Sequence, residues 1–217
     1  MARNYFDSEL INLKHALVRM GEAAENAIRK TTRALIDKDY TAAQQVIEED
    51  DIVDRMELEI ENSCIELIVQ QQPVARDMRF IFAINKIATD LERIADYAHS
   101  IAKLNIKMKD EVYMKRFVNI EKMSEIAARM IHSSLEAFIN MDMELAQNVY
   151  NMDDEIDDLY HEIFNELMAY VITDAKNINQ AMILLLIARY YERTGDHVQN
   201  ICEWVYYHQE GKHVSLD

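Results

Sequence analysis

The chain has 217 residues, half of them hydrophobic, and a formal net charge of −16 at pH 7. Such an acidic surface repels phosphate backbones, which argues against binding of nucleic acid. Three glycines, one proline and many helix-forming residues predict an all-α protein with little or no strand. The longest strongly apolar run, residues 181–188, is far shorter than the roughly 20 residues of a spanning helix, and no signal peptide is recognisable. We therefore expect a cytoplasmic protein.

The first half of the chain predicts three helices. Apolar or small residues recur every three or four positions through residues 8–37, which indicates an amphipathic helix. Asp39 is placed to cap a second helix, which continues until Pro73 ends it. A third helix is predicted at residues 76–108. The stretch DEVYMKRF that follows lacks the pattern and is expected to be a linker.

The same pattern then starts again in the second half. The segment from Met20 aligns with the segment from Met123 at an offset of 103, and the third predicted helices align at an offset of 100. We therefore expect six long helices, arranged as two tandem antiparallel three-helix bundles related by internal duplication. The first bundle would comprise residues 1–110 and the second residues 111–217. Helices of about 30 residues are about 45 Å long, so the molecule should be elongated.

Acidic residues recur four positions apart at equivalent places of the two halves. The pairs are Asp50 with Asp54, Glu92 with Asp96, Asp153 with Asp157, and Glu192 with Asp196. On a helix both members of a pair point to one side, where like charges repel by a few tenths of a kcal/mol. Two pairs on facing helices would bring four carboxylates together and form an oxygen-rich cation site.

Two interpretations of these acids remain open. Oxygen ligands suit Mg, Mn or Ca, and iron or zinc also accept carboxylates. Alternatively, arginines could neutralise the acids in ion-pair networks; the candidates are Arg55, Arg93, Arg189 and Arg193. Gly195 lies inside a predicted helix, which indicates close approach of another helix or a ligand.

The remaining chemistry-bearing residues form no recognisable catalytic motif, and we expect no enzymatic activity. The seven histidines show no metal-binding pattern. His197 follows Asp196, but an exposed helix position is favoured over a ligand, and His99 carries no special signal. Cys64 and Cys202 fall inside helical patterns and are expected to be small core residues.

The duplicated segments DLERIADYA and YYERTGDHVQNI, with EEDDIVDRMELEIE and NMDDEIDDLYHEI upstream of them, resemble the PhoU family over essentially the whole chain. The resemblance implies a regulator that represses phosphate-starvation genes when phosphate is plentiful. It would act through a phosphate ABC transporter and a sensor histidine kinase, reach the membrane only through these partners, and form a homodimer.

The resemblance also implies that the four acidic pairs bind divalent or iron ions, with Fe, Zn, Mg and Mn as candidates. Ala95 stands where the usual family motif has Gly, and Thr194 stands where it has Ile. Both changes keep the acids. The alternatives to a regulator are a carboxylate-rich metal-binding or metal-storage helical protein, or a metal-dependent enzyme with two carboxylate sites. A third alternative is a helical adaptor without metal.

Overall fold

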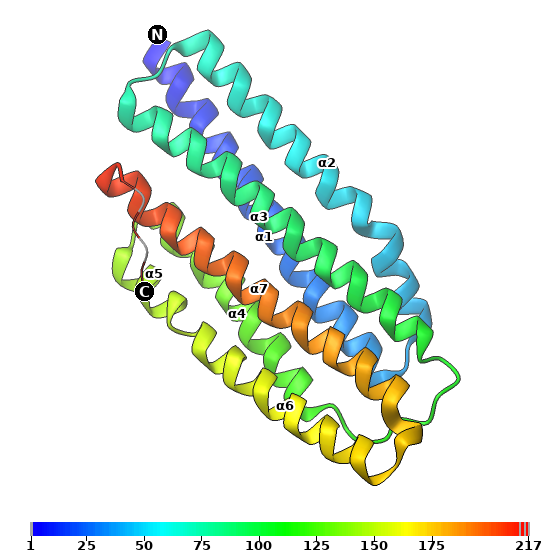
Figure 1. The fold of residues 1–217 in the computed structure, drawn as a ribbon. Coiled ribbons are helices and arrows are strands. Elements are labelled where there is room, and N and C mark those ends of the chain that lie inside the picture. The colour runs from blue at the N-terminus through cyan, green and yellow to red at the C-terminus, as the bar shows by residue number, and fades with distance from the viewer. Residues whose placement is uncertain (1, 213, 215, 217) are drawn as a thin grey trace.

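The structure is a computed structural model that describes residues 2–212, 214 and 216 (Figure 1). This part of the chain contains seven α-helices, one short 3-10 helix and no strand, which confirms the all-α prediction. The elements are α1 (Ala2–Asp37), α2 (Tyr40–Gln71), α3 (Ala75–Lys107), α4 (Val118–Asn140), α5 (Met143–Tyr150), α6 (Asp153–Thr173), η1 (Ala175–Asn177) and α7 (Ile178–Glu210). Among these residues, no helix is long and apolar enough to cross a membrane.

The first three helices lie close to their predicted positions, except that α1 begins at Ala2. The Asp39 side chain caps α2 by accepting hydrogen bonds from the backbone N–H groups of Thr41 and Ala42, at 3.1 and 2.9 Å. Helix α2 ends at Gln71, two residues before Pro73, with Gln72 in the left-handed region at φ 45°. Its end is therefore set by local sequence, as predicted.

The fifth predicted helix is divided into α5 and α6 by a tight turn at Asn151 and Met152. The N–H of Met152 bonds to the carbonyl oxygen of Val149 at 3.0 Å, and the N–H of Glu155 bonds to that of Met152 at 3.2 Å. These i to i−3 bonds tighten the helix locally. The turn makes Asp153 the first residue of α6, whereas its counterpart in the first half lies within an unbroken helix.

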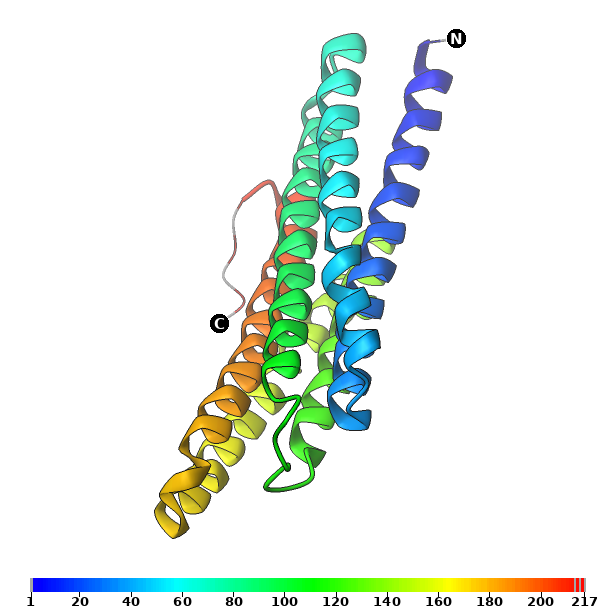
Figure 2. The ribbon, with the colours of Figure 1, turned by 90° about the vertical axis from the view of Figure 1, so that its right-hand side faces the viewer.

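The helices form two antiparallel bundles that lie side by side (Figures 1 and 2). Helices α1 and α3 pack against α4 and α7, while α2 and α6 lie at opposite outer edges. The tandem, elongated arrangement agrees with the duplicated sequence. A single hydrophobic core nevertheless runs through both bundles, from Leu17 and Leu91 to Phe138 and Ile201. The division at residue 110 stays a prediction about sequence repeats, because the bundles share this core.

Two close contacts join the bundles. A Cβ atom at Gly21 of α1 would lie 1.9 Å from Cδ1 of Leu135 in α4, so the glycine provides room for that side chain. The buried hydroxyl of Thr32 lies 2.6 Å from that of Ser124 in α4 and 2.5 Å from that of Tyr191 in α7. Buried hydroxyls need hydrogen-bond partners, so this cluster favours one register of the bundles.

Replacing Tyr191 by Phe should lower the free energy of unfolding by about 1 kcal/mol, because a buried inter-bundle hydrogen bond is lost. Urea unfolding followed by circular dichroism measures the change. Tyr190→Phe is the matched control, since no hydrogen bond of its hydroxyl is found among the described residues. Equal effects of the two changes would contradict a stabilising role for the hydroxyl cluster.

Candidate metal centres between paired helices

The first acidic group lies between α2 and α3. Asp50 interrupts a stripe of buried side chains on α2, between Val46 and Val53, and is itself half-buried. Glu92 and Asp96 lie on the facing side of α3, next to the buried Leu91 and Ala95. The amphipathic pattern of each helix therefore directs these acids toward the edge of the shared core.

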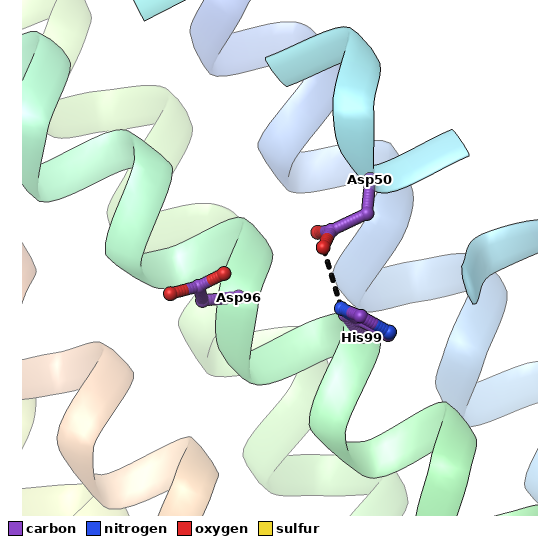
Figure 3. A group of neighbouring side chains, drawn as sticks. All are labelled: Asp50, Asp96 and His99. Carbon is purple, nitrogen blue, oxygen red and sulfur yellow. Dashed lines mark ion pairs between the residues drawn. The ribbon is translucent and has the colours of Figure 1, made fainter. Parts of the chain in front are cut away.

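The structure adds a histidine to this group. Ligand atoms of Asp50, Asp96 and His99 all lie within 4.8 Å of one another (Figure 3). Nδ1 of His99 is 2.5 Å from Oδ2 of Asp50, and Nε2 of His99 is buried without a hydrogen-bond partner. Sequence reasoning gave His99 no special role. The signal was its position three residues after Asp96, which places both side chains on one helix face.

Burial and neighbouring negative charges raise the pKa values of Glu92 and Asp50 in this group. Burial is the main cause that raises the pKa of Glu92 to about 7, and the negative charges of Asp96 and Asp54 add to it. Burial also raises the pKa of Asp50, against the opposing effect of His99. Asp50 and Glu92 are therefore each close enough to Asp54 and Asp96 to be repelled by them.

The second acidic group lies between α6 and α7 and is more deeply buried. Asp153 is only 6% exposed, and burial, followed by the charges of Asp157 and Asp196, raises its pKa to about 7. Burial and the charge of Asp196 also raise the pKa values of Asp157 and Glu192. One carboxylate oxygen each of Asp153 and Glu192 is buried with no hydrogen-bond partner. Such atoms are costly unless a cation or proton satisfies them.

Gly195 makes the burial of Asp153 possible. A Cβ atom at Gly195 would lie 1.8 Å from Oδ1 of Asp153, so the carboxylate packs directly against the backbone of α7. This confirms the predicted close approach of a neighbouring helix. The equivalent position in the first half is Ala95, which carries the Cβ atom that Gly195 lacks. Asp50 accordingly lies further out and pairs with His99.

Arginines neutralise only part of each acidic group. Arg93 lies 3.4 Å from Glu92 and 3.0 Å from Asp96, and in α7 Arg193 pairs with Asp196 at 3.5 Å while Arg189 pairs with Glu192. These arginines are about half exposed and lie on the same helices as their partners, where such pairs contribute about 0–1 kcal/mol.

The most buried acid of each outer helix lies beyond the reach of these arginines. Among the described residues, no arginine pairs with Asp50 or Asp153, and Arg55 bonds to the backbone of its own helix. The ion-pair interpretation therefore accounts for the acids of α3 and α7 but not for Asp50 and Asp153, although the charge of Arg189 opposes the rise in the pKa of Asp157. Glu92, Asp153 and Glu192 each have a buried carboxylate oxygen that accepts no hydrogen bond, and such oxygens fit a bound cation, although that of Glu92 also lies 3.4 Å from Arg93. Metal binding by the eight acids stays a prediction.

His197 is not the exposed helix residue that was expected. Its side chain is 15% exposed, its Nδ1 lies 2.8 Å from Asp90, and its Nε2 lies 3.1 Å from the hydroxyl of Tyr97. Asp90 and Tyr97 belong to α3, so His197 joins the two bundles. The expectation was wrong because α7 is covered by α3 on this face, which the sequence of one helix does not reveal.

Comparisons with known proteins agree with the duplicated architecture. The PhoU domain model matches the chain twice, at residues 17–104 and 120–205. A Clostridium acetobutylicum protein described as a phosphate-specific transport system accessory protein PhoU homolog is 40% identical, and the match covers 100% of both chains. The Escherichia coli K12 phosphate-specific transport system accessory protein PhoU is 33% identical over 98% of this chain and 89% of its own length.

Two solved structures share the fold. The crystal structure of PhoU from Pseudomonas aeruginosa superposes with a TM-score of 0.90 at 34% identity, covering 95% of this chain and 100% of that one. The phosphate transport system regulatory protein PhoU from Streptococcus pneumoniae superposes with a TM-score of 0.89 at 27% identity, covering 96% of this chain and 99% of that one.

Replacing Asp153 by Asn should stabilise the metal-free protein at about pH 7.5 by about 1–2 kcal/mol, since it removes a buried, repelled charge. The folded protein holds the Asp153 proton up to about pH 7, whereas the unfolded chain loses it near pH 4. The charge therefore destabilises the fold above pH 7, and the penalty is relieved as the pH falls from 7 towards 4.

The stabilisation by Asp153→Asn should accordingly shrink at about pH 5.5. Urea unfolding in the presence of a chelator, at both pH values, measures it. The exposed Asp158 of the same helix supplies the control change Asp158→Asn. A gain from Asp153→Asn that is the same at both pH values would contradict the assigned cause.

Proposed function

The chain belongs to the PhoU family, and from this premise we propose that it is a cytoplasmic negative regulator of phosphate uptake and phosphate-starvation signalling. The observation that carries the proposal is the match of both repeats, over essentially the full chain, to accessory proteins of a phosphate-specific transport system. The protein associates with the phosphate ABC transporter and keeps a sensor histidine kinase inactive when phosphate is plentiful.

The proposed action is that of an adaptor and not of an enzyme. The net charge of −16 disfavours direct contact with promoter DNA, so repression has to pass through other proteins. Long helices that share one core offer extended, rigid faces for such partners. The acidic groups lie between α2 and α3 and between α6 and α7, beside the two outer helices of the molecule.

Metal ions fit this adaptor as structural cations. The first centre would use Asp50, Asp54, Glu92 and Asp96, and the second would use Asp153, Asp157, Glu192 and Asp196. A bound Fe, Zn, Mg or Mn ion would neutralise carboxylates that otherwise repel one another, and would offer positive charge to an acidic partner surface. Support comes from the buried carboxylate oxygens of Glu92, Asp153 and Glu192 that accept no hydrogen bond.

A homodimer is part of the proposal. Exposed apolar side chains occur at equivalent positions of α3 and α7, namely Met78 and Phe82 in one half and Ile178 and Met182 in the other. Apolar side chains gathered on one face of a helix favour association with another surface.

A carboxylate-rich metal-storage protein is the second candidate. The same buried oxygens favour it. The two functions differ in their consequences: a storage protein alters the cellular metal content, whereas a regulator alters the expression of phosphate genes.

Deleting the gene should release the repression of phosphate-starvation genes in phosphate-rich medium, because the kinase would no longer be held inactive. Transcript levels of the starvation genes in deletion and complemented strains measure the effect. Normal repression in the deletion strain would contradict the proposal, as would tight binding of the purified protein to promoter DNA at physiological salt.

Replacing Glu92 and Asp96 together by Ala should remove about half of the bound divalent metal if each centre fills equally. Elemental analysis of protein dialysed against Mn²⁺ or Zn²⁺ measures the stoichiometry. Glu121 and Glu125, an exposed pair four residues apart on α4, supply the matched control double change to Ala. Unchanged stoichiometry in the Glu92 and Asp96 variant would favour the ion-pair interpretation of the acids.

A further inference from the structure

We propose that the two metal centres select different cations, because His99 gives only the first centre a nitrogen ligand. The first centre, with Asp50, Asp96 and His99, takes a transition-metal ion such as Zn²⁺. The second centre, built on Asp153 and Glu192, takes an oxygen-preferring ion such as Mn²⁺. This inference rests on the proposed metal binding and assigns a cation class to each centre.

The first centre combines nitrogen and oxygen donors. The ligand atoms of its three residues lie within 4.8 Å of one another (Figure 3). Zinc bonds to histidine nitrogen and carboxylate oxygen at about 2.0–2.2 Å, so small side-chain rotations close these ligands around one ion. The His99 and Asp50 side chains are only 19% and 15% exposed, which fixes them between α2 and α3. A site partly withdrawn from water is thus already assembled.

The second centre has no equivalent nitrogen. At the offset of 100, Gln199 stands where His99 stands in the first half, and its amide contacts the carbonyl oxygen of Tyr150 at 3.4 Å. His161 lies one turn after Asp157 and partly opposes the rise in the pKa of that residue, but its side chain is exposed. Within the part of the chain that the structure describes, the group around His99 is the only one with three ligand atoms within 4.8 Å.

A second sequence difference reinforces the first. Gly195 lets the Asp153 carboxylate pack against α7, where its Oδ1 is buried without a hydrogen-bond partner. In the first half, the methyl group of Ala95 leaves no room for a carboxylate against the backbone of α3. Asp50 pairs with His99 instead. Each half therefore has a matched pair of residues, Ala95 with His99 or Gly195 with Gln199.

The ligand types determine the selectivity. Imidazole nitrogen favours zinc and the later transition metals, whereas carboxylate oxygens favour Mg, Ca and Mn. Zn²⁺ should consequently prefer the first centre, and Mn²⁺ the second.

Zinc and manganese titrations of the metal-free full chain test the proposal, using a competing chelator and X-ray absorption spectroscopy. Wild-type protein should bind one Zn²⁺ more tightly than any other, with a nitrogen ligand at about 2.0–2.1 Å. His99→Gln should weaken this site at least about 10-fold and remove the nitrogen signal, while Mn²⁺ binding at the second centre stays unchanged. Circular dichroism verifies that the variant is folded.

The controls separate His99 from the other histidines. His132→Gln changes an exposed histidine on α4, and His161→Gln changes the one beside the second centre; neither should alter the tight zinc site. The double variant Ala95→Gly with His99→Gln should make the first centre resemble the second and bind Mn²⁺ in place of Zn²⁺.

Two results would overturn the inference alone: an unchanged tight zinc site in His99→Gln, or loss of that site in His161→Gln. A wild-type protein that binds neither Zn²⁺ nor Mn²⁺ would overturn the inference together with the proposed metal binding. The regulatory proposal would then rest on the gene-expression test by itself.

Discussion

The structure at the two outer edges of this protein depends on keeping carboxylates of adjacent helices close together although they repel one another. In each half, an outer helix and a central helix bring acids so close that burial and mutual repulsion raise their pKa values. Arginines on the central helices offset only part of this charge. The fold tolerates the arrangement because a shared hydrophobic core and buried inter-bundle hydrogen bonds hold the helices in place. A bound cation would convert the repulsion into attraction.

Duplication provides two copies of this constraint, and local substitutions have made the copies different. In the second copy, Gly195 lets the Asp153 carboxylate pack against the backbone of the neighbouring helix. The first copy has Ala95 there and adds His99, which pairs with Asp50. Two centres of unequal chemistry on opposite edges would let one adaptor bind two different cations. The acids at the two edges differ in their burial and in their neighbours.

Most of the fold could be predicted from the sequence because it is encoded locally. Hydrophobic periodicity, the Asp39 cap and Pro73 mark the helix positions, and the repeat offsets give the topology. The break at Asn151 and Met152 was not predicted, since neither residue is a strong helix breaker. The acidic pairs were identified as well, but not the histidines. His99 and His197 owe their roles to the side chains that face them across helix interfaces, and a single sequence does not show which faces meet.

Crystals grown with Mn²⁺, with anomalous diffraction data collected near the manganese edge, test the central claim most directly. The account predicts an anomalous peak between α6 and α7, within bonding distance of Asp153 and Glu192. It would be contradicted by a structure in which Arg189 and Arg193 fill that space, hydrogen-bond the buried carboxylate oxygens and leave no peak beside them.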